Sequence, residues 1–155
     1  MTDPQQEVAE AARLARRAVD LGRDEAVALS LGGFVLTYVV GDLDDGAAFV
    51  ERALGLNPNL AIAWAHGGFM KIRFGEHNTA IEHEARAMRL SPLDPFLWAW
   101  HFFTALAHFF AGRPEDAASC VEARTMEALN SAYHTPGWVS RPARSCIRAR
   151  PTTVS

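Results

Sequence analysis

The sequence predicts an all-α fold built from stacked helix pairs, on three observations. The segment RALGLNPNLAIAW (52–64) is echoed 34 residues later by RAMRLSPLDPFLW (86–98). Within each unit, apolar residues follow the i, i+3, i+4 spacing of one buried helical face. No stretch alternates apolar and polar residues for long enough to predict a strand. The chain has 155 residues, 49% of them apolar, which is enough to bury a core without disulfides or metals.

The first three helices are predicted from the repeat of about 34 residues and from the position of a glycine that ends a helix. Ala18 and Leu21 repeat about 35 residues later as Ala53 and Leu56, so the chain begins with half a unit. Gly41 precedes its counterpart Gly75 by 34 residues and ends the next helix. We therefore expect helices over residues 5–21, 26–40 and 43–56.

The later helices are bounded by residues that stop or start a helix. Gly75 is a natural C-terminal cap because glycine accepts a positive φ without steric cost. Pro92 stops a helix, and Asp94-Pro95 predicts an N-cap followed by proline at the first helical position. Pro114 opens the last helix, with two acids at the positive end of its dipole. The expected helices cover residues 60–74, 78–90, 95–111 and 114–130.

Seven helices form about three and a half units: a half unit at 5–25, then 26–60, 61–94 and 95–130. A single helix pair cannot bury its own apolar face, so the units must stack, and at least three are needed. Residues 131–155 have a different composition, rich in proline and arginine. Disorder is the leading interpretation of this tail, and a basic contact strip or a truncated repeat are the alternatives.

This pattern resembles the tetratricopeptide repeat, over residues 5–130. The resemblance implies a right-handed α-solenoid. Departures from the consensus are Gly67 and Lys71 in the second unit, Gly46 in the first and Arg124 in the third. The matching positions are Gly41, Ala53 and Pro58 in the first full unit; Trp64, Gly68, Gly75, Ala80, Ala87 and Pro92 in the second; and Ala105, Gly112 and Ala117 in the third.

A second likeness concerns residues 90–117. This segment is similar to repeats at the C-terminal end of some bacterial class III adenylate cyclases and winged-helix transcriptional regulators. That likeness implies an alternative function, a detached regulatory or sensory extension of such a protein. The chain contains neither a cyclase nor a DNA-binding domain of its own.

The tetratricopeptide resemblance implies a concave groove that binds a peptide. Most of the implied groove is apolar and lacks the Lys, Asn and Arg of the family's carboxylate clamp, so a chaperone-tail receptor is not expected. An amphipathic helix or an extended apolar peptide would suit it, with Arg73 pairing to an acid. The alternative is that further helices or a second copy of the chain cover the groove. The implied groove residues are Leu31, Val35, Tyr38, Val39, Ile62, Ala65, Phe69, Ile72, Arg73, Phe102, Leu106, Phe109 and Phe110.

Charge and motifs exclude several other functions. Residues 131–155 carry four arginines and no acid, which leaves 11 basic against 18 acidic residues in the body, so nucleic acid is not an expected partner. No phosphate-binding loop, nucleophile elbow or HExxH spacing is present. His101 and His108 are interpreted as half-buried helical residues and Cys120 as a small packing residue. We therefore expect a non-catalytic interaction module without cofactor or metal.

The surroundings expected for this module are cytoplasmic. The longest apolar stretch, residues 96–111, is too short and too polar for a transmembrane helix, so no membrane contact is expected. The N-terminus has no secretion signal. The partner is a protein or peptide, and an exposed apolar end after the helix at 114–130 would favour a homodimer.

Overall fold

The computed structural model describes residues 3–122, and these residues form helices without any strand. The predicted all-α class is confirmed. Each of the seven expected helical segments is present, the last of them followed only from residue 114 to residue 122. The others are α1 (Pro4–Leu21), α2 (Ala26–Val35) with a π-helical continuation η1 (Leu36–Val40), α3 (Leu43–Leu56), α4 (Ala61–Arg73), α5 (His77–Leu90) and α6 (Leu97–Phe110).

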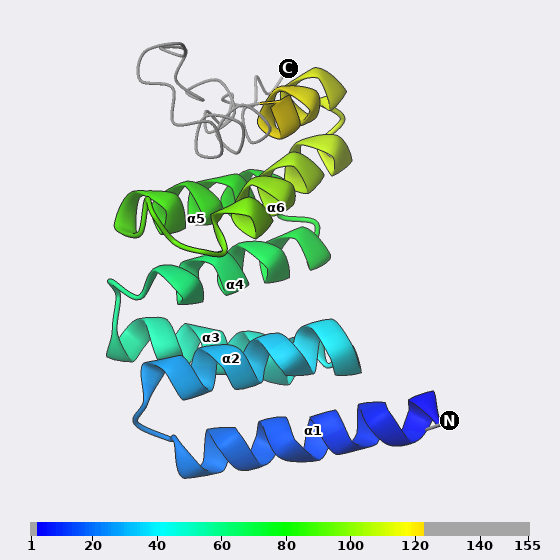
Figure 1. The fold of residues 1–155 in the computed structure, drawn as a ribbon, viewed down its shortest axis with the longest axis vertical. Coiled ribbons are helices and arrows are strands. Elements are labelled where there is room, and N and C mark those ends of the chain that lie inside the picture. The colour runs from blue at the N-terminus through cyan, green and yellow to red at the C-terminus, as the bar shows by residue number, and fades with distance from the viewer. Residues whose placement is uncertain (1–2, 123–155) are drawn as a thin grey trace.

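The helices pack chiefly against their neighbours in sequence. Each of α1 to α6 contacts the next one, and direct contacts also join α2 to α4 and α4 to α6. Figure 1 shows that α2, α4 and α6 run in one direction and that α1, α3 and α5 run in the other. The chain advances along its longest axis, from α1 at one end to residues 114–122 at the other. The even-numbered helices therefore lie near one another although they are far apart in sequence.

Three glycines close equivalent turns, as the period predicts. Gly41, Gly75 and Gly112 have φ values of +82°, +80° and +73°, a left-handed conformation that only glycine adopts at low cost. After Gly75, the Glu76 N–H donates to the carbonyl of Lys71 at 2.8 Å. The prediction of glycine caps at these turns is confirmed.

The start of α6 differs from the prediction. The helix begins at Leu97 rather than at residue 95. The Asp94 carboxylate accepts from the Phe96 N–H at 2.9 Å and from the Ser91 hydroxyl at 3.1 Å, which fixes a turn over residues 91–96. Asp94 and Pro95 therefore form this turn and do not cap the first helical residue.

The core lies as a series of clusters between neighbouring helices. One cluster contains residues from all four of the helices α1, α2, α3 and α4. A second cluster, around Trp100, lies between α4, α5 and α6. A third lies between the same helices α4, α5 and α6, at their other ends. Small residues let the helices approach closely. At Gly68 in α4, an added Cβ would lie 2.5 Å from Oε1 of Glu84 in α5. Gly68 therefore lies at the crossing of these two helices.

Candidate ligand-binding groove

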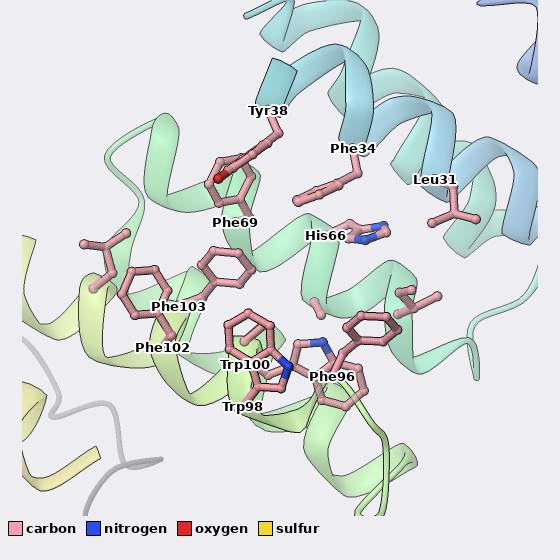
Figure 2. A pocket seen from close by; sticks show the side chains of 14 residues that line it. Leu31, Phe34, Tyr38, His66, Phe69, Phe96, Trp98, Trp100, Phe102 and Phe103 are labelled. Carbon is pink, nitrogen blue, oxygen red and sulfur yellow. The ribbon is translucent and has the colours of Figure 1, made fainter. Parts of the chain in front are cut away.

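A cavity of about 530 Å³ lies between the even-numbered helices α2, α4 and α6 (Figure 2). Its volume falls in the range of sites that hold a small molecule or a short peptide segment. We call it the aromatic groove, because more than half of its lining residues carry a ring. It is lined by Leu31, Phe34, Tyr38, Ile62, Ala65, His66, Phe69, Phe96, Trp98, Ala99, Trp100, Phe102, Phe103 and Leu106.

Helical spacing explains how each helix contributes to this groove. On the α2–η1 segment, Leu31, Phe34 and Tyr38 are three and four residues apart and therefore share one face. On α4, Ile62 and Phe69 are seven residues apart, which is two helical turns. The three helices run in the same direction, so these faces meet in a single groove.

The floor of the groove is a connected set of rings centred on Phe69. The Phe69 centroid lies 5.1 Å from that of Phe103, 5.5 Å from that of Phe34 and 5.6 Å from that of Tyr38. These distances suit tilted and edge-to-face aromatic pairs, which add to the stability from area burial alone. Residues of all three helices are therefore joined, and the groove is formed before any ligand arrives.

The rim of the groove is open to solvent. Tyr38 is 62% exposed, Phe96 56%, Phe102 54% and Trp98 50%, whereas Phe69 and Trp100 on the floor are nearly buried. Contiguous exposed apolar surface of this kind usually marks an interaction site in a soluble protein. A ligand can reach the groove without any movement of the helices.

His66 supplies a polar group at the floor. Its Nδ1 lies 2.8 Å from the Ser30 hydroxyl, and its ring stacks under that of Phe34 with centroids 4.3 Å apart (Figure 2). Burial lowers the pKa of His66 to about 4, although hydrogen bonding to Ser30 opposes that shift. The imidazole is therefore neutral at pH 7. No side chain that lines the groove carries a charge at that pH.

One end of the groove is polar. At the N-terminal ends of α4 and α6 it continues, past the shared residues Ile62 and Phe96, into a shallower hollow of about 440 Å³. This hollow contains Asn59, Ser91 and Asp94. The site therefore consists of an apolar groove with a carboxylate near one end.

The structure brings together some of the predicted groove residues and not others. Ile72 is 5% exposed and packs in the core with Ala80, Ile81 and Ala107, so its assignment to the groove is wrong. It follows Phe69 by three residues, and that rotation turns it towards α5 and α6. The predicted residues that line the groove are Leu31, Tyr38, Ile62, Ala65, Phe69, Phe102 and Leu106.

The remaining predicted residues lie outside the cavity. Val35 is half-buried and Val39 is exposed, both beside the lining face of the α2–η1 segment. Arg73 is exposed one turn beyond Phe69 on α4. Phe109 and Phe110 are 60% and 56% exposed near the end of α6, past the last lining residue of that helix.

Several lining residues were not predicted. Phe34 could have been found, because it lies three residues after Leu31 and four before Tyr38. Phe96 and Trp98 reach the groove because the Asp94 turn displaces the start of α6, which the sequence pattern did not indicate. The other lining residues missed are His66, Ala99, Trp100 and Phe103.

Two other buried groups could bear on function. Glu84 is fully buried, and neither of its carboxylate oxygens has a hydrogen-bond partner within residues 3–122; burial raises the pKa of this carboxyl well above its usual value. Cys120 is also fully buried, as expected for a small packing residue, and it is disulfide-bonded.

Residues 3–122 contain neither a cluster of metal ligands nor a helix that could span a membrane. No group of three or more His, Cys, Asp or Glu side chains within this range could hold a metal ion. No helix formed by these residues combines the length and apolarity that a bilayer-spanning segment needs. The predictions about the tail at 131–155, and about a dimer contact beyond the last helix, lie outside the described residues.

Comparison with known proteins adds no family: no protein-family model matches the chain, and no curated protein sequence matches it. The function must therefore be argued from the groove itself.

Proposed function

We propose that this protein is a tetratricopeptide-like right-handed solenoid of about three and a half repeats that acts as a non-catalytic protein-interaction module. The 34-residue period, the two-helix units and the equivalent glycine turns at Gly41, Gly75 and Gly112 support the repeat architecture. The alternating helix directions agree with it. In such arrays the first helices of successive units line the binding surface, and here these are α2, α4 and α6.

The ligand proposed for the aromatic groove is an apolar peptide segment or the apolar face of a partner helix. The observation that carries this proposal is the row of exposed rings above a buried aromatic floor. Such anchors dominate binding energy at protein interfaces, because rings bury a large area with few rotatable bonds. The fixed contacts around Phe69 reduce the entropy that binding would otherwise cost.

The proposal that the module is non-catalytic is supported by the chemistry of the groove. Its only serine–histidine pair is Ser30 with His66, and the Ser30 side chain is fully buried, so no substrate could reach it. The lining residues contain no carboxylate that could orient His66 as a general base. The groove therefore offers contact area and no accessible nucleophile.

The test is selection of short random peptides displayed against the full chain, followed by affinity measurement on two variants. Phe102→Asp places a charge on the rim, and Phe109→Asp places the same charge one heptad later on the same helix, outside the cavity. Phe102→Asp should weaken binding of the selected peptides about tenfold or more, which corresponds to about 1.4 kcal/mol. Phe109→Asp should leave the affinity within about twofold of wild type.

Far-UV circular dichroism of both variants controls for folding, since both side chains are exposed and neither change should reduce helicity. Equal binding by the two variants would show that the peptides bind elsewhere. Failure to enrich any peptide would also count against the groove as a peptide site.

A further inference from the structure

The three helices that line the aromatic groove carry little charge. Helix α6 and the α2–η1 segment contain no Asp, Glu, Lys or Arg, and α4 contains only Lys71 and Arg73. The Lys71 ammonium is paired with Glu76 at 3.0 Å. Arg73 is exposed and makes no ion pair with any residue between 3 and 122.

Arg73 lies in line with the groove. It follows the lining residue Phe69 by four positions and Ile62 by eleven, so the three lie on one face of α4. Arg73 is one turn beyond Phe69, the last lining residue of α4, and lies at the C-terminal end of that helix. A ligand that extends past Phe69 would meet the guanidinium.

Asp94 occupies the opposite end. It lies in the polar hollow at the N-terminal ends of α4 and α6, which share their direction (Figure 1). Its two oxygens accept from the Ser91 hydroxyl and the Phe96 N–H, which are both neutral donors. No cation within the described residues neutralises this carboxylate. The groove therefore runs from an uncompensated negative charge to an uncompensated positive one.

We propose that the aromatic groove selects an apolar peptide segment with opposite charges at its two ends, a cationic side chain at Asp94 and an acidic side chain at Arg73. This inference rests on the proposed function and specifies the chemistry and the orientation of the ligand. The apolar middle of the segment supplies affinity, and the two end charges set its orientation and exclude uniformly charged segments.

The length of the groove fixes the spacing of the two charges. Eleven residues of α4 separate Ile62 from Arg73, which is about 17 Å at 1.5 Å per residue. An extended peptide covers about 3.3 Å per residue and would carry its two charges about five residues apart. A bound helix would carry them about eleven residues apart. Peptides of both spacings are therefore included in the test.

Both residues also complement helix ends, so a purely structural role must be separated from a role in binding. Arg73 lies in the last turn of α4, where a cation interacts favourably with the helix dipole. Arg89 likewise lies in the last turn of its helix, α5, is exposed and does not line the groove, which makes it a suitable control. Asp94→Asn removes the charge and keeps the Oδ1 acceptor for the Phe96 N–H, while its amide NH2 replaces Oδ2 and can donate to the Ser91 hydroxyl.

The experiment measures the affinity of the full chain for two sets of four synthetic peptides, one set for each spacing, all with an apolar core of Phe, Leu and Ala. In each set, the first peptide has Lys at one end and Glu at the other. The second has Lys at both ends, the third has Glu at both ends, and the fourth has Gln at both ends. The Lys/Glu peptide should bind best, by about three- to fivefold for each matched end relative to the Gln peptide. Asp94→Asn should abolish the benefit of Lys, and Arg73→Glu should make the two-Lys peptide the preferred ligand.

The outcomes separate this inference from the proposed function. Arg89→Glu should leave the order of the four affinities unchanged. If Arg89→Glu made the two-Lys peptide the preferred ligand, as Arg73→Glu should, the inference would be overturned. Equal affinity for all four peptides, lost in Phe102→Asp, would overturn the charge selection and leave the groove as a peptide site. Binding that Phe102→Asp does not weaken would overturn both.

Discussion

Gly33 of α2 and Gly46 of α3 are in backbone contact across the helix pair: a Cβ on Gly33 would lie 2.6 Å from the Gly46 carbonyl oxygen. The approach is equally close from the other side, where a Cβ on Gly46 would overlap the Thr37 hydroxyl. Both glycines are buried. Because the obstacle for Gly33 is backbone and not the end of a flexible side chain, the two helices cannot adjust by a rotamer change.

The first prediction follows from this contact. Gly33→Ala should lower the free energy of unfolding by about 2 kcal/mol, because the added methyl group forces α2 away from α3. Gly55→Ala is the control on α3, since a Cβ there meets nothing within 4 Å. It should raise stability by about 0.5–1 kcal/mol through helix propensity. Urea unfolding of the two variants measures both values, and destabilisation by both would contradict the packing argument.

The second prediction concerns acid pH and His66. Its folded-state pKa of about 4 lies below the unfolded value of 6.5, so the unfolded chain takes up the proton first. Stability should therefore fall as the pH drops from 6.5 to about 4, by on the order of 3 kcal/mol from this group. His66→Gln cannot titrate and should lack this part of the pH dependence. The measurement is the difference between the two unfolding free energies at pH 7 and pH 4.5.

The third prediction concerns Glu84, whose contribution to stability changes with pH in the opposite direction to that of His66. Its folded-state pKa is raised, so its carboxyl stays protonated in the fold while the unfolded chain releases the proton. The stabilising effect of that proton is complete below pH 4.5 and is lost as the pH rises towards the folded-state pKa. Glu84→Gln should therefore stabilise the protein increasingly above pH 4.5.

The gain from Glu84→Gln at pH 8 should be about 1 kcal/mol or more, because a buried polar group without a partner costs about 1–3 kcal/mol and a charged one costs more. Glu82→Gln is the matched control, since Glu82 is exposed on the same helix two residues earlier. It should change stability by no more than about 0.5 kcal/mol at either pH. Equal effects of the two substitutions at pH 8 would contradict the role of burial.

The fourth prediction concerns Trp64, which lies on α4 away from the groove. The Arg86 guanidinium lies 4.4 Å from the Trp64 ring centroid, and the indole N–H donates to the Pro58 carbonyl at 2.8 Å. Arg86→Gln should cost about 0.5–1 kcal/mol, as expected for a partly exposed cation–π pair. In a Trp64→Leu background the same change should cost almost nothing, so a double-mutant cycle on unfolding free energies isolates the pair.

The helix pattern could be predicted from the sequence because it depends on local signals. The left-handed turns at Gly41, Gly75 and Gly112 follow from the one residue that adopts that conformation cheaply, and the bounds of most helices agree within a residue or two. The start of α6 was predicted at residue 95 and lies at Leu97, because Asp94 bonds within its own turn instead of capping the helix. A side chain with two local bonding choices cannot be assigned from its type alone.

The groove could be predicted only in part. The repeat identifies which helices face one another, and residues such as Tyr38 and Phe69 were placed in the groove from that alone. It does not fix the rotation of each helix about its axis, which depends on what the neighbouring helices bury. Ile72 was therefore assigned to the groove although it packs in the core, and Phe34 was missed although it stacks on His66.

The groove walls come from three helices that are separated in sequence, and this affects how cooperatively the protein unfolds. Helices α1 to α6 pack chiefly against their neighbours in sequence, so the ends can open without the middle. A ligand seated between Leu31 and Leu106 would contact both ends of this span at once. Its binding energy would then be lost whenever either end opened, so an occupied groove would make otherwise independent segments unfold together as one cooperative unit.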